Sequence, residues 1–329
     1  MKEHYINALT AGSDITDFFM VKSIGIKMGS NKKNYLDLML GDSSGEMNGK
    51  KWDISDEEAD SLMSIAEGDI VKIKAQVTEW NGIRQLRIGR IRKAEARDEL
   101  QMADFVKAAP EDPQEMFSYV LERANAIKDE GLKRLAVNAL EENREKLLYY
   151  PGAMRNHHAE LAGLLYHIRR MLTMGLKACQ VYTNLDKDWV VCGVIMHDME
   201  KLSELKANEL GISSGYTASG NMLGHLVMGA IKLEERAKAA GLSEEKTVMM
   251  QHMIISHHYE PEFGSPIKPL FPEAELLHYL DMLDAKMFDF EAALETAEPG
   301  SFTERVRTLD GRMLYKPTFE MTNTEKNKR

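Results

Sequence analysis

The chain has 329 residues, of which 43% are hydrophobic and 29% charged, and its formal net charge is −10. This length indicates about two domains, since one hydrophobic core seldom grows beyond about 250–300 residues. No apolar run approaches the ~20 residues that a membrane helix needs, so no contact with a membrane is expected. The N-terminus lacks the apolar core of a secretory signal, and Cys179 and Cys192 are its only cysteines, so a reducing cytoplasm is expected.

The acidic balance argues against a general nucleic-acid-binding surface, because phosphate binding is driven largely by lysine and arginine. The distribution of charge can override the total. Between Gly68 and Ala96 the chain is locally basic, and the acid lies mostly elsewhere. The basic residues of this stretch are Lys72, Lys74, Arg84, Arg87, Arg90, Arg92 and Lys93.

The segment from Ile15 to about Arg92 alternates apolar and polar residues, the pattern of half-buried strands. The stretches that carry this pattern are FFMVKSIGIKM, NYLDLMLGD, DIVKIKAQVTEW and RQLRIGRIRKA. An Asn-Gly pair predicts a turn between the last two. A short helix is expected in ISDEEADSLMSIAEGD, with Ser55 as its N-cap and Gly68 near its end. Five or so strands with one inserted helix favour a small all-β barrel of the OB type over residues 1–100.

Two prolines and several acids in DFVKAAPEDPQEMF mark a domain boundary, so residues 101–113 are predicted to be a linker. From there on the apolar residues recur with the helical period, as in KRLAVNALEENREKLLYY and NMLGHLVMGAIKLEERAKAAG. An all-helical domain is therefore predicted over residues 114–316. The polar segment 317–329 has no periodicity and is expected to be disordered.

Several imidazoles and carboxylates of the helical domain fall on apolar helix faces, where an unpaired polar group is costly. A single histidine there is more often a hydrogen-bonded core residue than a ligand, and a single aspartate is more often a cap or an ion-pair partner. Jointly, such a set favours a site for Mn, Fe, Zn or Co. The set consists of His167, the doublet His197-Asp198, His225, the doublet His257-His258 and Asp281, with Asp284 as the alternative to Asp281.

The motifs GLLYH, IMHDMEK, MLGHL, IISHH, EFGSP and LLHYLDMLDAK follow one another in an order that resembles the HD-domain metal-dependent phosphohydrolases, and within them the YhaM-type 3′-to-5′ exoribonucleases. The doublet HD is weak evidence by itself. The longer stretches HHAELAGLLYH, EFGSPIKP and LDMLDAK are far more specific. The resemblance covers nearly the whole chain and implies a multidomain protein, with a small N-terminal OB-fold barrel followed by an all-α HD domain.

The resemblance also implies the site. The ligands of a first metal would be His167, His197, Asp198 and Asp281. Asp198 would bridge to a second metal held by His225 and His257, with His258 as a further candidate, and Lys201 and His158 would neutralise charge on the phosphate. One or two divalent ions are expected, Mn²⁺ foremost, with Co²⁺, Mg²⁺, Fe²⁺ and Zn²⁺ as alternatives.

The chain departs from the family pattern at four positions near these motifs. Glu200 stands where a small glycine usually precedes the lysine, and Tyr259 stands where a glycine usually follows SHH. Leu161 and Ala162 also occupy positions where glycine is common. These larger side chains are expected to crowd the loops around the site.

The implied activity is hydrolysis of single-stranded RNA, and of single-stranded DNA as a second substrate, from the 3′ end to 5′-mononucleotides. OB folds hold single strands in basic grooves with aromatic platforms, and the candidate strand-binding residues here are Trp80, Lys72, Lys74, Arg84 and Arg87, although a tryptophan near a hairpin is as often a packing residue. Two other functions stay open: an HD phosphohydrolase for a small nucleotide, and a non-catalytic single-strand-binding protein. Assembly into a homo-oligomer is left open as well.

Overall fold

The computed structural model describes residues 2–29, 33–52, 54, 62, 64–80, 82–101, 104–154, 158–209, 211–295 and 297–319, without the side chains of Trp80 and Ala96. Most of the helix expected to begin at Ser55 lies outside these residues, as do Asn81 of the expected turn and the tail beyond residue 319. The chain divides into two compact units, Met1–Ala108 and Ala109–Arg329.

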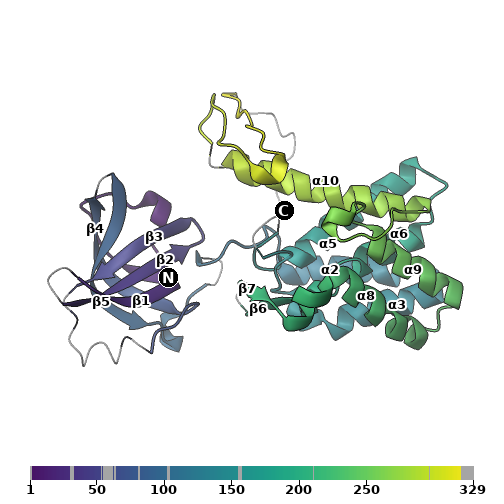
Figure 1. Ribbon diagram of the computed structural model, residues 1–329, viewed down its shortest axis with the longest axis horizontal. Helices are drawn as coiled ribbons and strands as arrows, with labels where there is room; N and C mark the ends of the chain where they lie inside the picture. The colour runs from purple at the N-terminus through teal and green to yellow at the C-terminus, as the bar shows by residue number, and fades with distance from the viewer. Residues whose placement is uncertain are drawn as a thin grey trace. The chain divides into compact units, whose positions relative to one another are not determined.

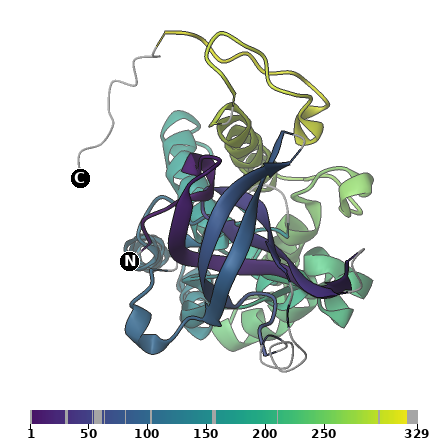
Figure 2. The ribbon, with the colours of Figure 1, turned by 90° about the vertical axis from the view of Figure 1, so that its left-hand side faces the viewer.

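Within its described residues, the first unit is a closed barrel of five strands (Figures 1 and 2). The strands run in the order β1-β2-β3-β5-β4 around the barrel, and β1 also pairs with β4. The contact between β3 and β5 is parallel, whereas the other pairs are antiparallel. This order is that of an OB fold, so the predicted all-β barrel is confirmed. The strands are β1 (Asp14–Met28), β2 (Asn34–Asp42), β3 (Gly45–Lys51), β4 (Ile70–Trp80) and β5 (Ile83–Lys93).

The barrel core follows from the alternation of the strands, since every second side chain points inward. Phe19, Leu38, Ile73 and Leu86 are at most 1% exposed. Strand β1 is long enough to pair with β4 along its first half and with β2 along its second half. Its register with β2 shifts between Val21 and Ser23, and such a bulge bends a strand. The sequence did not single out β3, GEMNGKK, because its glycines, asparagine and lysines have low β propensity.

Part of the predicted linker packs within the barrel unit. Phe105 is fully buried, and the Lys2 ammonium lies 5.8 Å from the centre of its ring. The Asp104 carbonyl accepts a hydrogen bond from Ser43 N at 3.0 Å, and the Asp104 carboxylate accepts one from the Tyr5 hydroxyl at 2.7 Å. A short 3-10 helix, η2 (Ala96–Asp98), precedes this segment. Residues on both sides of position 100 therefore belong to one packed body.

The second unit is helical, as predicted, with one short two-stranded sheet that the sequence did not indicate (Figure 1). The sheet pairs β6 (Leu205–Ala207) with β7 (Ser213–Tyr216), which lies in a stretch that reads as a loop in the sequence. The α-helices are α2 (Pro113–Asn125), α3 (Glu130–Glu142), α4 (Arg144–Leu147), α5 (Gly163–Val181), α6 (Lys187–Met196), α7 (Lys201–Glu204), α8 (Ala218–Ala240), α9 (Glu244–Ser256) and α10 (Pro272–Glu295).

Helix α6 is the central element of this unit. Every residue from Val190 to Met196 is buried, and α6 packs against α2, α3, α5, α9 and α10. A helix that is apolar on all sides needs such a surround. Several neighbours begin at side-chain caps: Asp112 for α2, Asp129 for α3 and Ser243 for α9 accept hydrogen bonds from the first free backbone N–H groups. The C-terminal end of α6 is thereby held in the interior.

The chain continues beyond α10 as an ordered segment. Residues 302 and 315, and 306 and 312, form antiparallel bridges around η5 (Arg307–Leu309), which packs on α10. Across the described residues, no helix combines the length and the apolar character that crossing a membrane requires.

Candidate metal centre

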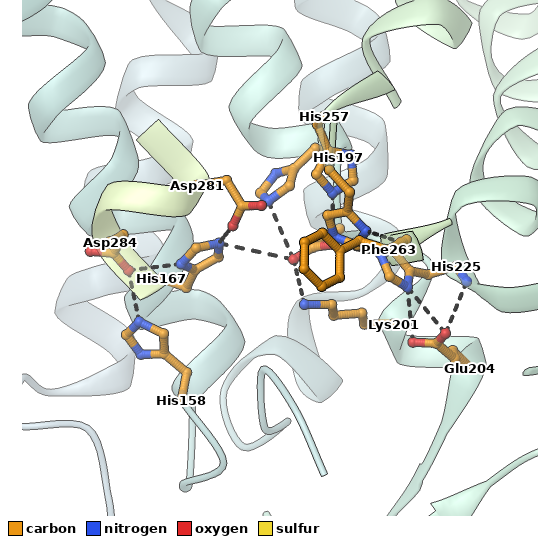
Figure 3. Close-up of polar contacts among 12 residues, drawn as sticks. His158, His167, His197, Lys201, Glu204, His225, His257, Phe263, Asp281 and Asp284 are labelled. Atoms are coloured by element: carbon orange, nitrogen blue, oxygen red, sulfur yellow. Dashed lines mark hydrogen bonds and ion pairs between the residues drawn. The ribbon is translucent and has the colours of Figure 1, made fainter. Parts of the chain in front are cut away.

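Five helices bring imidazoles and carboxylates to one place in the second unit (Figure 3). His167 comes from α5, and the doublet His197-Asp198 follows the last residue of α6. His225 lies on α8, His257 directly follows α9, and Asp281 lies on α10. His167, His197, Asp198 and His257 are at most 3% exposed. The six residues predicted as metal ligands are thus neighbours in space.

Asp198 lies at the middle of this group. Its Oδ2 is 3.3 Å from His197 Nε2 and 3.9 Å from His167 Nε2. Its Oδ1 is 3.3 Å from His225 Nε2 and 3.7 Å from His257 Nε2. The two carboxylate oxygens therefore face two different pairs of imidazoles. Asp281 Oδ1 joins the first pair, 3.2 Å from His167 Nε2.

These polar atoms fit a divalent ion. Among the residues that the structure describes, no hydrogen-bond partner faces Asp198 Oδ1 or the Nε2 atoms of His197, His225 and His257, although all are buried. Unpaired buried polar atoms are costly. Among the described residues, three sets of side chains bring their ligand atoms within 4.8 Å of one another, and one of them is His158, His167 and Asp284. The two sets that contain Asp198 are His167, His197 and Asp198, and Asp198, His225, His257 and His258. An ion in each would satisfy them.

The Nδ1 atoms of the histidines are all engaged away from this centre. Those of His197, His257 and His258 lie 2.7–2.8 Å from the carbonyl oxygens of Val194, Ile254 and Phe263. A carbonyl only accepts, so Nδ1 carries the proton and donates it. The lone pair then sits on Nε2, which is the arrangement that backbone and carboxylate partners impose on metal-binding histidines.

Asp284 backs His167 in the same way. Its Oδ2 lies 2.8 Å from His167 Nδ1 and 2.7 Å from His158 Nε2, and its Oδ1 lies 2.6 Å from Arg170 Nε. The sequence left Asp281 and Asp284 as alternatives. The structure gives each a place, because Asp281 faces Nε2 of His167 and Asp284 faces Nδ1. His158 contacts the outer carboxylate Asp284, so its expected action on a phosphate stays a prediction.

Glu204 backs His225, and the sequence gave no reason to single it out. Its carboxylate lies 3.1 Å from His225 Nδ1 and accepts a hydrogen bond from His225 N at 3.0 Å. That backbone N–H is available because α8 breaks at Gly224, whose φ of 68° lies in the left-handed region that favours glycine. The break and the carboxylate together orient His225 Nε2 toward Asp198.

Lys201 lies one turn beyond the doublet, with its ammonium 2.7 Å from Asp198 Oδ2. Burial would lower the pKa of Lys201, but Asp198 and Asp281 raise it above its ordinary value. Burial would likewise raise the pKa of Asp198, but Lys201 and His197 hold it well below its ordinary value. Lys201 therefore stays an ammonium ion beside an ionised carboxylate.

The protonation of the imidazoles differs across the centre. Burial and the neighbouring His258 and His197 lower the pKa of His257 well below its ordinary value, so His257 is neutral. Burial would also lower the pKa of His167, but hydrogen bonds to Asp281 and Asp284 raise it to about 9. At neutral pH an ion would displace a proton from His167 on binding.

Comparison with known proteins shows to which family this chain belongs. The HD domain model matches residues 164–286. The protein named 3′-5′ exoribonuclease YhaM from Halalkalibacterium halodurans is 36% identical over 308 residues, which cover 94% of this chain and 94% of that protein. The protein of the same name from Bacillus subtilis is 35% identical over 308 residues, 94% of this chain and 96% of that protein. The chain belongs to the YhaM family of 3′-5′ exoribonucleases. The HD domain is metal-dependent, and the clusters around Asp198 can hold such ions.

Solved structures add little to this assignment. A domain of replication protein A from Methanococcus maripaludis is 25% identical and covers 28% of this chain and 94% of that chain, with a TM-score of 0.24. A replication protein A heterotrimer bound to single-stranded DNA is 14% identical and covers 30% of this chain, with a TM-score of 0.22. The OB fold of this YhaM-family chain therefore rests on its strand order.

The departures from the YhaM family pattern have structural counterparts. Ala162 and Tyr259 adopt φ angles of 58° and 68°, so they stand in the left-handed conformation that glycine tolerates best. Tyr259 gains ring contacts in exchange: its ring lies 4.7 Å from that of His278 and 4.3 Å from the Lys268 ammonium. Glu200 is 9% exposed and forms an ion pair with Arg236 at 2.8 Å.

Tyr259 offers a direct measure of this backbone strain. The Tyr259→Gly variant is expected to be more stable than Tyr259→Ala by about 1 kcal/mol, because both lose the ring but only glycine relieves the left-handed backbone. Urea unfolding of the two variants gives the difference. At Glu235, exposed on α8, the order should invert, since alanine is about 1 kcal/mol better than glycine inside a helix. The same order at both positions would contradict the strain.

The predicted strand-binding residues of the barrel divide into two groups. Lys74 and Arg87 are exposed, and Lys72, half-buried, lies 4.8 Å from the Phe18 ring on the same side of β4 as Lys74. Arg84 instead donates a hydrogen bond to the Leu9 carbonyl. The Trp80 side chain is not described, so its role stays a prediction.

A different aromatic pair stands out on the barrel. Tyr35 of β2 and Trp52, the residue after β3, stack with ring centres 4.5 Å apart, and Trp52 is 43% exposed. The Lys50 ammonium lies 5.8 Å from the Trp52 ring. Strands 2 and 3 form the ligand-binding face of OB folds. The sequence reading missed this pair because it did not recognise β3, which places Trp52 opposite Tyr35.

Proposed function

We propose that this chain hydrolyses single-stranded RNA from the 3′ end to 5′-mononucleotides, with single-stranded DNA as a second substrate. Membership of the YhaM family makes it a hydrolase of phosphodiester bonds. The observation that carries the proposal is the Asp198 carboxylate, whose two oxygens face two separate pairs of imidazoles. Two divalent ions bridged by one carboxylate suit in-line displacement at phosphorus.

The ligand sets follow from the contacts above. We propose that one ion is held by His167, His197, Asp198 and Asp281, and a second by Asp198, His225 and His257. Mn²⁺ is the ion that we expect first, with Co²⁺, Mg²⁺, Fe²⁺ and Zn²⁺ as alternatives, since mixed imidazole and carboxylate sites accept all of them to some degree.

The chemistry is shared between the ions and the chain. Divalent ions, when bound, supply an acidified water and neutralise phosphoryl charge. The imidazoles that would hold the ions have fixed orientations, because their Nδ1 atoms are tied to carbonyls and carboxylates. They thereby fix where ions, and the phosphate bound to them, would be held. Lys201 adds a positive charge at the same place, which favours the charge that develops on the phosphate during displacement.

End-labelled RNA tests the direction and the product. A 5′-labelled single strand is expected to shorten as a ladder in Mn²⁺, whereas a 3′-labelled strand releases its label at once as a mononucleotide. Chelator should stop both reactions. Internal fragments, or release from the 5′ end, would contradict the proposal. A turnover confined to small nucleotides would favour the phosphohydrolase alternative instead.

The barrel is proposed to guide the strand over Tyr35 and Trp52. The Trp52→Ala variant is expected to lose ~1–3 kcal/mol of affinity for single-stranded RNA, the usual worth of stacking one base. Fluorescence anisotropy in chelator measures this loss. Trp52→Phe keeps a ring and should retain most of the affinity, and Arg87→Ala should instead lower the salt slope of log K by about 0.7. Wild-type affinity in Trp52→Ala, together with a wild-type salt slope in Arg87→Ala, would show that the barrel does not guide the strand.

We also propose where the protein acts. The cytoplasm is the expected location, where RNA is present and where the free thiols of Cys179 and Cys192 are stable. Assembly into a homo-oligomer stays a prediction.

A further inference from the structure

The loop between α9 and α10 carries the EFGSP motif, to which the metal chemistry assigns no part. The loop contains a short 3-10 helix, η4 (Pro261–Phe263), followed by Gly264 at a φ of 95°. Phe263 is 69% exposed, although its ring is wholly apolar. An aromatic ring left in solvent beside a functional centre suggests a surface for a ligand.

Hydrogen bonds fasten this loop to the candidate metal centre. His258, whose ring is grouped with Asp198, His225 and His257, donates from Nδ1 to the Phe263 carbonyl at 2.8 Å. His258 N donates to the Ser265 hydroxyl at 3.1 Å, and Ser265 is fully buried. Phe263 N in turn donates to the Glu260 carbonyl at 3.0 Å. The backbone of Phe263 is therefore held at a fixed place relative to the imidazoles.

In the view of Figure 3 the Phe263 ring is drawn in front of the imidazole cluster, and the hydrogen bond from His258 ties the Phe263 backbone to that cluster. The ring therefore belongs to a residue that is fastened to the cluster at which the phosphate is proposed to be held. A nucleobase joined through its ribose to that phosphate would find a flat apolar surface there. Stacking on such a ring tolerates every base, because every base has a π face.

We propose that Phe263 stacks on the base of the 3′-terminal nucleotide and so holds the last residue of the strand while its phosphodiester is cleaved. This inference rests on the proposed function. It assigns a contact to the terminal base, which the metal ligands would not touch. The ligand class is a nucleoside 5′-monophosphate, either as the strand terminus or as the released product. Ring stacking explains how a nuclease removes all four nucleotides without hydrogen-bonding to their base edges.

Titration with the product tests base stacking on Phe263 without relying on nuclease activity. In Mn²⁺, calorimetric titration of the wild-type protein with 5′-AMP and with ribose 5-phosphate is expected to show about ten-fold tighter binding of 5′-AMP, within the 5- to 150-fold range that base stacking on one ring corresponds to. In Phe263→Ala the two ligands should bind about equally. Phe263→Tyr should restore the preference, because it keeps the ring.

Phe302→Ala is the matched control, since Phe302 is 60% exposed in the same unit and lies 5.2 Å from Tyr315, far along the chain from the loop. It should keep the wild-type preference for 5′-AMP. A preference that survives in Phe263→Ala, or that is absent from the wild-type protein, would overturn the stacking. Loss of the preference in Phe302→Ala as well would also overturn it, because the effect would then not belong to the loop.

Labelled RNA with an abasic 3′-terminal nucleotide extends the test to the strand. The wild-type protein should remove the abasic residue about ten-fold more slowly than a normal one, as kcat/KM, and Phe263→Ala should remove both at similar rates. If the slow step instead follows an abasic penultimate residue, the terminal assignment is wrong. If the wild-type protein cuts no RNA at all, the proposed function fails, while the titrations with 5′-AMP still decide the role of Phe263.

Discussion

The Asp198→Asn variant is expected to lose hydrolysis of RNA by several orders of magnitude while it stays folded. The amide has nearly the shape of the carboxylate, but it carries no charge and presents a donor to one of the two imidazole pairs that Asp198 faces. The imidazole pair that faces the amide nitrogen would lose its carboxylate partner, and the other pair would keep only a neutral oxygen, so the chemistry that ions held there would supply should be lost.

Metal content and activity are measured on the same preparation. Elemental analysis after dialysis against Mn²⁺ is expected to show less metal in Asp198→Asn, and in the double variant His197→Ala/Asp198→Ala, than in the wild-type protein. Asp289→Asn, which neutralises a carboxylate of α10 that is not among the proposed ligands, controls for the change in charge. Circular dichroism checks the fold. Wild-type metal content together with wild-type turnover in Asp198→Asn would rule out the centre.

The Glu204→Gln variant is expected to weaken one metal site and to spare the other. Among the described residues, Glu204 forms hydrogen bonds and an ion pair with His225 but none with the proposed ligands His167, His197 and Asp281. Loss of a carboxylate behind a ligating histidine commonly costs 10- to 100-fold in metal affinity. One of two binding steps in a Mn²⁺ titration should therefore shift by that factor.

Asp284→Asn is the reciprocal variant, because Asp284 backs His167 on the other side of Asp198. It should shift the other step, and it should also lower the stability, since Arg170 would lose a buried partner. A single binding step that both variants weaken equally would show that one ion, not two, occupies the centre. No change in either variant would show that these carboxylates do not support metal ligands.

Much of the fold was predictable because it depends on periodicity. Alternation indicated the barrel, the helical period indicated the second unit, and both are confirmed. The structure also brings together the six predicted ligands, whose helix faces could be read from apolar spacing. Their function as ligands stays a prediction. Strand β3 escaped because its residues have low β propensity and its place is fixed by its neighbours β2 and β5.

The outer part of the site depends on contacts between distant segments, which spacing does not reveal. Glu204 meets His225 across 21 residues, and the meeting needs the break of α8 at Gly224. The sequence left Asp281 and Asp284 undivided because both lie on one turn of α10, and only the position of His167 between them separates their contacts. In the barrel, the sequence predicted Trp80 as the aromatic residue that binds the strand, whereas the described stack is that of Tyr35 and Trp52.

The position of His197 and Asp198 at the end of α6 bears on how the centre responds to thermal fluctuation. Sites on surface loops open locally at little cost, whereas segments in the middle of a core exchange their amide hydrogens only when the whole domain opens. Because α6 is buried from Val190 to Met196 and is packed by five other helices, the doublet belongs to the second class. Amide exchange at the end of α6 should therefore report the global unfolding of the helical unit, and the His197-Asp198 doublet should persist on warming until that unit itself unfolds.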